Sequence, residues 1–244
     1  MITKEFISKI HNSADKYPDA IFSEKGKMYT CVNSFAYHLF RKHPEIFTSL
    51  DGLFVDGMSM CWMIKLLWRH NIPRLSFDMT GMAVDLFDRL NNNDETIYFV
   101  GARQTEIENT IRQITIAYPR MNIKGFRNGY FDSEQQRNDE IRKIVDSNPD
   151  FTVVGMGIVL QEKFALDLKK AGYKGIVFTC GGFLHQTTEN INYYPDWINR
   201  YNLRAFYRLY KEKGLFKRLY YVLLEFPVLF TYDSVKTKLL NPGK

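Results

Sequence analysis

Short apolar runs alternate with longer amphipathic segments along most of this 244-residue chain. Runs that suit buried strands lie at 28–32, 53–55, 96–100, 121–126, 151–154 and 175–180. Segments with helical periodicity lie at 35–43, 58–69, 82–90, 105–118, 133–145 and 161–171. Ser34 and Ser133 stand where they can cap the helices that follow them, and 58–69 is apolar enough to predict a buried helix. The alternation predicts an α/β fold, a Rossmann-like, mostly parallel sheet with helices on both faces.

The pattern changes near Pro195, after which helical segments follow one another without strands. We therefore expect a Rossmann-like domain over residues 1–195 and a helical appendage over 196–244. In the appendage, aromatic residues interleave with the cations Arg204, Arg208, Lys211, Lys217 and Arg218. Helices of this composition can lie on a membrane surface, where the aromatic residues are buried and the cations meet anionic headgroups. A helix pair packed on the sheet, with a solvated basic face, would have the same composition.

The distribution of charge and the cysteine content indicate the kind of partner and the cellular compartment. The formal charge of +6 is concentrated between Arg200 and Arg218, which indicates an anionic partner. The N-terminus lacks the apolar core of an export signal, and no apolar window reaches the ~18–20 residues that span a bilayer. Cys31, Cys61 and Cys180 form no CxxC pair, so we expect buried free thiols. The sequence thus predicts a cytoplasmic protein that at most associates peripherally with a membrane.

Several predicted strands end in glycine or in a polar residue followed by glycine. These ends are Asp56-Gly57, Gly101, Gly155 and Gly181-Gly182. The carboxyl ends of parallel strands share one edge of the sheet, so we expect these loops to converge on one ligand crevice. Backbone N–H groups in the turn from Gly155 to Gly157 and at the start of the next helix can face an anion there. Gln161 and Glu162 add polar groups, although an ordinary strand-to-helix turn would carry the same pattern.

Three polar residues, two at predicted strand ends and one at the start of a loop, are candidates for chemistry, each with an ordinary structural alternative. Asp56 suits a general base, because it follows a strand beside a glycine, but it could equally cap the helix at 58–69. Asn33 could hydrogen-bond a sugar or cap the helix after it. Arg74 could bind a phosphate or pair with Asp78.

Motifs for several other chemistries are missing. The sequence has no DxD motif for a metal-bridged nucleotide-sugar site, and its five histidines lack metal-ligand spacing. It has no GxGxxG after a strand, no GxxxxGK[ST] and no GxSxG. We therefore expect neither a metal nor a cofactor. We also expect no nucleic-acid partner, because no reader motif accompanies the aromatic residues.

Together these pieces resemble the WecG/TagA/CpsF glycosyltransferases, glycosyltransferase family 26, from about Met28 to Tyr220. The resemblance rests on motifs in the family's order: Asn33, Val55-Asp56-Gly57, Arg74, Gly129-Tyr130-Phe131-Asp132, Gly155-Met156-Gly157 with Gln161-Glu162-Lys163, Gly181-Gly182-Phe183, Pro195-Asp196-Trp197 and Tyr207-Arg208-Leu209. It implies an inverting, metal-independent enzyme that moves a sugar, typically N-acetylmannosamine, from a UDP-sugar to a polyprenyl-diphosphate-linked acceptor. Such enzymes act at the cytoplasmic membrane face in surface-polysaccharide or cell-wall polymer synthesis.

The resemblance also implies roles for individual residues. Asp56 would be the general base, Asn33 would position substrate and Arg74 would face the diphosphate. Arg208 and Arg218 of the appendage would stabilise the charge of the departing UDP. The nucleotide-sugar pocket would be lined by Gly101, Gly129, Tyr130, Phe131, Gly155, Gly157, Gln161, Glu162, Gly181 and Gly182.

The sequence departs from the family pattern near these positions. Ser76-Phe77-Asp78 stands in place of the usual Gly-x-Asp, and Ile158-Val159-Leu160 lacks the usual proline. The usual aspartate is also missing after Gly181-Gly182-Phe183, where Leu184-His185-Gln186-Thr187 follows. These departures cluster where sugar and acceptor would sit, so the resemblance fixes neither the donor nor the acceptor; we expect a role in a capsular or O-antigen polysaccharide pathway. The alternative is a catalytically silent module that binds a nucleotide-sugar or a lipid. A homo-oligomer is also conceivable if the core exposes an apolar strip.

Overall fold

The computed structural model describes residues 4–188, 191, 198, 200, 207 and 219–240. Within these residues one six-stranded sheet runs in the order β2-β1-β6-β5-β3-β4, with every pair of neighbours parallel. The strands are β1 (Met28–Val32), β2 (Gly52–Val55), β3 (Thr96–Gly101), β4 (Asn122–Arg127), β5 (Phe151–Gly155) and β6 (Ile176–Thr179). The α/β fold is confirmed, and the sheet is parallel throughout rather than mostly parallel.

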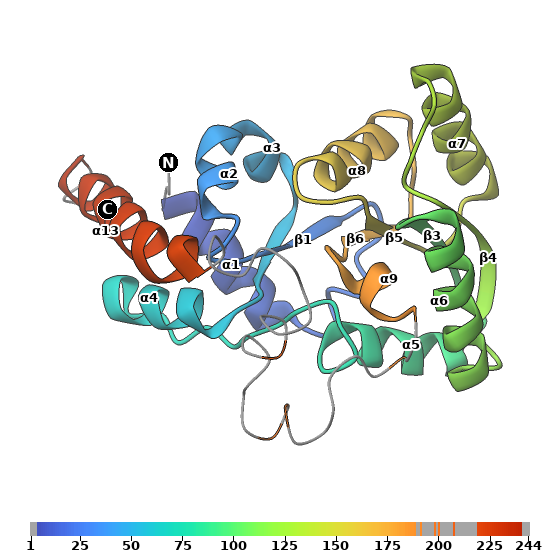
Figure 1. The fold of residues 1–244 in the computed structure, drawn as a ribbon, viewed down its shortest axis with the longest axis horizontal. Helices are drawn as coiled ribbons and strands as arrows, with labels where there is room; N and C mark the ends of the chain where they lie inside the picture. Colours follow the sequence, from blue (N-terminus) through green and yellow to red (C-terminus); the bar gives the residue numbers. More distant parts are fainter. Residues whose placement is uncertain are drawn as a thin grey trace.

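Helices cover both faces of the sheet, as expected (Figure 1). One apolar layer joins the sheet to α1 (Lys4–Lys16), α2 (Tyr37–Lys42), α3 (Pro44–Ser49), α4 (Met58–Trp68), α7 (Glu134–Ser147), α8 (Leu160–Lys170) and α13 (Phe226–Leu240). The other joins it to α5 (Met82–Asn92), α6 (Gln104–Ala117) and α9 (Phe183–Gln186). A π-helix, η1 (Tyr221–Glu225), leads into α13. Because β1 is covered on both sides, its successive residues Met28 and Tyr29 are buried in opposite layers.

Details at helix starts differ from the expectation in two places. Ser34 does not cap α2: its hydroxyl lies 2.8 Å from that of Ser59, while Asn33 Oδ1 accepts a hydrogen bond from the Ala36 N–H at 3.0 Å. α3 was not expected, since Pro44 begins a new helix instead of only ending the previous one. The predicted cap Ser133 is confirmed, because its hydroxyl accepts from the Gln136 N–H at 3.1 Å.

α4 is the clearest departure from the sequence-based picture. We expected a buried helix, and Met60, Cys61 and Ile64 are indeed buried. The opposite side is not, because Trp62 is 64% exposed and Leu66 is 72% exposed. The prediction of a wholly buried helix is therefore wrong: apolar residues lie on both sides of α4, and only one side is covered.

Buried polar contacts fix α13 to the domain that the sheet forms. Asp233, which is fully buried, accepts hydrogen bonds from the Tyr37 hydroxyl and from Arg41 Nε, both at 2.7 Å. The Trp68 indole N–H donates to the Ser234 hydroxyl at 2.9 Å. α13 thus packs on α2 and α4. Most of the segment before it lies outside the described residues, so the boundary at 195/196 stays a prediction.

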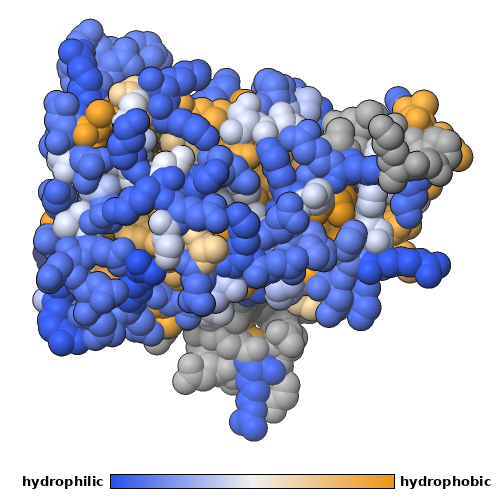
Figure 2. Space-filling view, turned by 180° about the vertical axis from the view of Figure 1, so that it is seen from behind, coloured by the Kyte–Doolittle hydropathy of each residue, from blue (hydrophilic) through white to orange (hydrophobic). Residues whose placement is uncertain are grey.

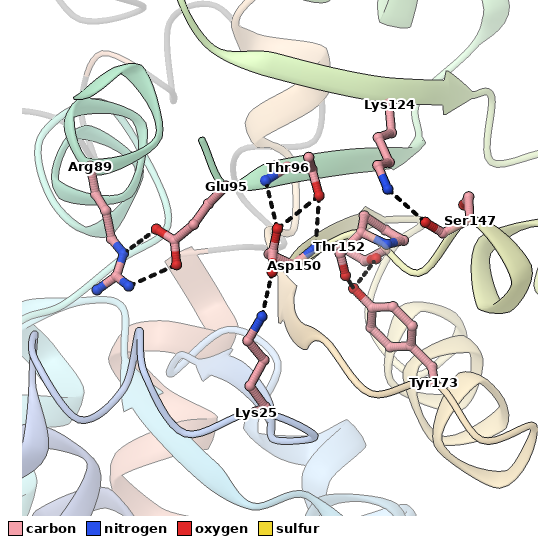
Figure 3. Close-up of polar contacts among 10 residues, drawn as sticks. Lys25, Arg89, Glu95, Thr96, Lys124, Ser147, Asp150, Thr152 and Tyr173 are labelled. Carbon is pink, nitrogen blue, oxygen red and sulfur yellow. Dashed lines mark hydrogen bonds and ion pairs between the residues drawn. The ribbon is translucent and has the colours of Figure 1, made fainter. Parts of the chain in front are cut away.

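A second polar cluster holds the amino ends of the central strands (Figure 3). The Asp150 carboxylate accepts from the Thr96 N–H and hydroxyl, each at 2.9 Å, and also contacts Lys25. The Tyr173 hydroxyl donates to the Pro149 carbonyl at 2.8 Å. These bonds tie β3, β5 and the N-terminal segment together at the edge opposite the one where ligands bind in such sheets.

The cysteines are free, as expected, and Cys61 and Cys180 are buried, whereas Cys31 is partly exposed. Burial raises the pKa of the Cys61 thiol to about 11 and that of Cys180 to about 12. In the part of the chain that the structure describes, no helix has both the length and the apolar character needed to cross a membrane.

Candidate active site

The carboxyl ends of the six strands form one edge, and their connections leave it in two directions. The segments after β1, β2, β4 and β5 lead to helices in one layer, whereas those after β3 and β6 lead to helices in the other. Adjacent strands whose connections diverge in this way leave a crevice between the loops. The strand order places β2 three positions from β5, a separation of about 14 Å at the usual strand spacing. The sheet edge is therefore long enough to have chemically different ends.

Asp56 and Arg74 meet at the β2 end of this edge. The Asp56 N–H donates to the Val32 carbonyl at 2.8 Å, which holds the aspartate directly beyond the strand. Arg74 Nη2 lies 3.1 Å from Asp56 Oδ1 and 3.0 Å from Asp78 Oδ2, so one guanidinium nitrogen bridges two carboxylates. The Asp56 side chain is 31% exposed and that of Arg74 is 21% exposed. α4 starts after Gly57 without a side-chain cap, so Asp56 is not the cap that we considered.

The charges in this trio stabilise one another. Burial alone would lower the pKa of Arg74, but the Asp56 and Asp78 carboxylates outweigh it and hold that pKa above its usual value. For Asp78, burial acts to raise the pKa, and Arg74 together with hydrogen bonds from Thr80 and Ser76 keeps it below its usual value. Arg74 and Asp78 are therefore both ionised at neutral pH, and the pairing with Asp78 that the sequence left open is present.

Three glycines of the predicted pocket are packed against one another. Gly101 pairs with Gly155 across β3 and β5, and a Cβ atom on Gly101 would lie 2.3 Å from the Gly155 carbonyl oxygen. A Cβ atom on Gly155 would lie 2.7 Å from Cys180 Sγ, and one on Gly129 would lie 3.0 Å from Gly101 Cα. Glycine at these positions is explained by close approach of the strand ends. Any contact of theirs with a ligand stays a prediction.

Gly157 and Gly181 differ from that trio, because both have positive φ (85° and 55°) and open space around the position of a Cβ atom. They are glycines because of the turns they make. Gly182 precedes α9 and has ordinary φ. In the loop after β4, Tyr130 is 65% exposed, while Phe131 stacks on Phe164 with ring centroids 5.9 Å apart.

Gln161 and Glu162 are buried beneath the loops. Glu162 Oε1 accepts from the Thr30 hydroxyl at 2.7 Å and from the Gln161 amide at 2.8 Å, and Oε2 accepts from the Val159 N–H at 2.6 Å. Gln161 Oε1 in turn accepts from the Gly181 N–H at 3.2 Å. The pair thus joins β1, the start of α8 and the loop after β6. Burial raises the pKa of Glu162 despite these hydrogen bonds.

Sequence reasoning missed what surrounds this carboxylate. Val159 has φ of 78°, a conformation that is unusual for a β-branched residue and that the Glu162 hydrogen bond holds. The Thr30 and Thr179 hydroxyls lie 2.6 Å apart within strands that are otherwise apolar. A polar residue inside a buried strand is the signal that could have revealed the cluster.

Among the other candidates, Arg208 and Arg218 lie outside the described residues.

Comparison with known proteins identifies the family to which the chain belongs. A sequence model of the "Glycosyl transferase WecG/TagA/CpsF family" matches residues 7–239. The chain belongs to this family. It is therefore a glycosyltransferase, as the motif resemblance implied.

Relatives within the family share most of their length with the chain. A UDP-Gal:alpha-D-GlcNAc-diphosphoundecaprenol beta-1,4-galactosyltransferase of Shigella boydii is 30% identical over 206 residues, covering 84% of this chain and 86% of the relative. An N-acetylglucosaminyldiphosphoundecaprenol N-acetyl-beta-D-mannosaminyltransferase of Bacillus subtilis (strain 168) is 28% identical over 199 residues, covering 80% and 75%. A Bacillus spizizenii protein of the same name is 24% identical over 179 residues.

Proposed function

We propose that this glycosyltransferase moves a hexose from a UDP-sugar to a polyprenyl-diphosphate-linked saccharide, with inversion and without a metal ion. The observation that carries the proposal is the position of Asp56, a partly exposed carboxylate beyond β2, held by Arg74 at one end of the sheet edge. In the described residues, hydrogen bonds occupy only its Oδ1 atom, so Oδ2 is available to a substrate hydroxyl.

In the proposed reaction, Asp56 accepts the proton of the acceptor hydroxyl while that oxygen attacks the anomeric carbon of the donor. The new C–O bond forms as the bond to UDP breaks, and the diphosphate departs with the electron pair. Arg74 orients Asp56 before the reaction through the contact between Arg74 Nη2 and Asp56 Oδ1. Since Arg74 is already shared between two carboxylates, stabilisation of the departing diphosphate falls to other donors. We assign it to Arg208 and Arg218 and to the backbone of the loop from Gly155 to Gly157.

The distance between the ends of β2 and β5 fits these separate roles of Asp56 and the Gly155 loop. The Gly155 loop follows β5, and Asp56 follows β2, about 14 Å away. An extended nucleotide-sugar can place its nucleotide at the β5 end and its sugar toward β2. Asn33, Gly181 and Gly182 follow the two strands in between and would border the sugar.

The relatives' names supply the candidate substrates. They specify galactose and N-acetylmannosamine as the transferred sugars, and acceptors in which N-acetylglucosamine is linked to diphosphoundecaprenol. Both names specify β-linked products. Because the usual sugar nucleotides of these hexoses are α-linked, a β-linked product requires inversion. We propose the same type of acceptor here, reached at the inner face of the cell membrane with the help of segment 196–244.

A transfer assay tests this function. UDP-galactose, UDP-N-acetylmannosamine and UDP-N-acetylglucosamine are offered with an N-acetylglucosamine-diphosphate-polyprenol acceptor, with magnesium or with EDTA. We expect transfer of one hexose in EDTA and a β-linked product by NMR. An α-linked product would refute inversion, and loss of transfer in EDTA would refute metal independence. If no UDP-sugar is a donor, the proposed function fails.

A further inference from the structure

The outward face of α4 is an apolar stripe on the surface. Met58, Trp62 and Leu66 follow one another at four-residue spacing, which places them along one side of the helix. They are 42%, 64% and 72% exposed, respectively. The side chains that α4 buries, such as Met60 and Ile64, point the other way. A tryptophan and a leucine this exposed, side by side, indicate a surface that something else covers.

α13 carries a second stripe of the same kind. Val228, Tyr232, Val235 and Leu239 recur at helical spacing and are 68%, 57%, 47% and 73% exposed. The residues that fix α13 to the protein, including Asp233, lie on its opposite face. α13 therefore packs through a mixed side of phenylalanines and hydrogen-bonded polar residues, and its outward side is apolar.

The two helices lie side by side at one end of the molecule (Figure 1). The Trp68 indole donates to Ser234, and the Lys238 ammonium lies 5.3 Å from the centroid of the Trp68 ring. Seen from behind, hydrophobic residues are exposed at this same end (Figure 2). We refer to the seven exposed apolar residues as the α4–α13 surface: Met58, Trp62, Leu66, Val228, Tyr232, Val235 and Leu239.

The exposed charges of both helices are all positive. The only acidic residue in α4 and α13 is Asp233, and it is buried and paired with Arg41. Lys65, Lys236 and Lys238 are exposed beside the stripes, and so is Arg69 at the end of α4. Apolar stripes bordered by cations match a membrane interface, where apolar groups enter the acyl boundary and cations meet anionic headgroups.

We propose that the α4–α13 surface contacts an anionic lipid membrane directly. The inference rests on the proposed function, in which the acceptor is lipid-linked, and it adds a contact made by the sheet domain itself. α4 begins two residues after Asp56, so this contact holds the proposed base close to the membrane that contains the acceptor. A second copy of the chain fits the surface less well. In a symmetric dimer the same cations would face one another.

Vesicle co-sedimentation tests the proposal without depending on turnover. The probe is the full chain with vesicles of phosphatidylcholine containing roughly one-third phosphatidylglycerol, against pure phosphatidylcholine. The variant Trp62→Ser/Leu66→Ser should weaken binding to the anionic vesicles by about tenfold or more, since two inserted side chains are lost. The matched control is Ile116→Ser, because Ile116 is 70% exposed on α6, outside the surface. It should bind like the wild type.

A second variant, Val228→Ser/Val235→Ser, tests the contribution of α13 to vesicle binding independently of α4. Thermal unfolding checks that each variant is folded. Wild-type binding in both double variants would overturn the proposal. So would equal binding to neutral and anionic vesicles. A wild type that dimerises through this surface and ignores vesicles would assign it to a second copy instead. If binding behaves as expected but no sugar is transferred, the proposed function fails and the lipid contact stands.

Discussion

Glu162 offers the most detailed prediction, because its buried carboxylate serves three donors at once. In Glu162→Ala the Val159 N–H, the Thr30 hydroxyl and the Gln161 amide lose their acceptor. The Thr30 hydroxyl can turn to Thr179, so one or two donors remain without a partner. At roughly 1–3 kcal/mol for each buried donor, we expect the free energy of unfolding to fall by about 2–4 kcal/mol. The strained turn at Val159 should also relax, which raises KM for the donor substrate.

The matched control is Glu106, which makes the same kind of capping hydrogen bond on a more exposed helix. Its carboxylate accepts from the Arg103 N–H at 2.8 Å, at the start of α6. Glu106→Ala should cost only about 1 kcal/mol, the usual value of a cap. Urea denaturation of both variants measures the difference. Equal losses in Glu106→Ala and Glu162→Ala would refute the reasoning.

Denaturation at several pH values gives a separate test of Glu162. Burial raises its pKa in the folded protein, so the folded state binds the proton more tightly than the unfolded state does. Its contribution to stability is therefore fully present below the unfolded pKa of about 4.3 and is lost as pH rises through the folded value. Glu162→Gln cannot titrate. As pH rises through this window, stability should shift in favour of the variant, and a constant difference would contradict the buried ionisable group.

Three further substitutions test other parts of the structure. Arg74→Ala should slow transfer by about tenfold to a hundredfold, whereas Arg74→Lys should retain more activity, because a single nitrogen bridges both carboxylates. Gly101→Ala should destabilise the protein by more than about 2 kcal/mol in urea denaturation, since its Cβ would collide with the Gly155 carbonyl, while Gly182→Ala should be nearly neutral. Asp233→Ala should lower the free energy of unfolding by about 3 kcal/mol in the same measurement, because the Tyr37 hydroxyl and Arg41 lose their buried acceptor.

The sheet could be predicted from the sequence because the strands are short apolar runs with glycines or polar residues after them. The run at 151–154 became β5, and Asp56 stands at the end of β2 as expected. Periodicity could not reveal the exposed side of α4, since a helix with apolar residues on both sides looks the same whether one or both are covered. Tertiary packing alone decides that Trp62 is exposed.

The site was foreseeable only in outline. The order of the family motifs singled out Asp56 and Arg74 as site residues. In the structure, Arg74 Nη2 lies 3.1 Å from Asp56 Oδ1. The sequence could not show that Glu162 is buried among hydroxyls from β1, because Thr30 is 132 positions away in the chain. Nor could it show why Gly101 and Gly155 are glycines, which depends on their being paired across neighbouring strands.

The rate of sugar transfer by Asp56→Asn tests the central claim most directly. The comparison is Asp78→Asn, which removes a carboxylate paired with the same guanidinium nitrogen of Arg74. If Asp56 is the general base, Asp56→Asn should lose about 10²–10⁴-fold in rate while still binding the UDP-sugar, and Asp78→Asn should lose much less. Near-wild-type transfer by Asp56→Asn, or equal losses in the two variants, would contradict the assignment.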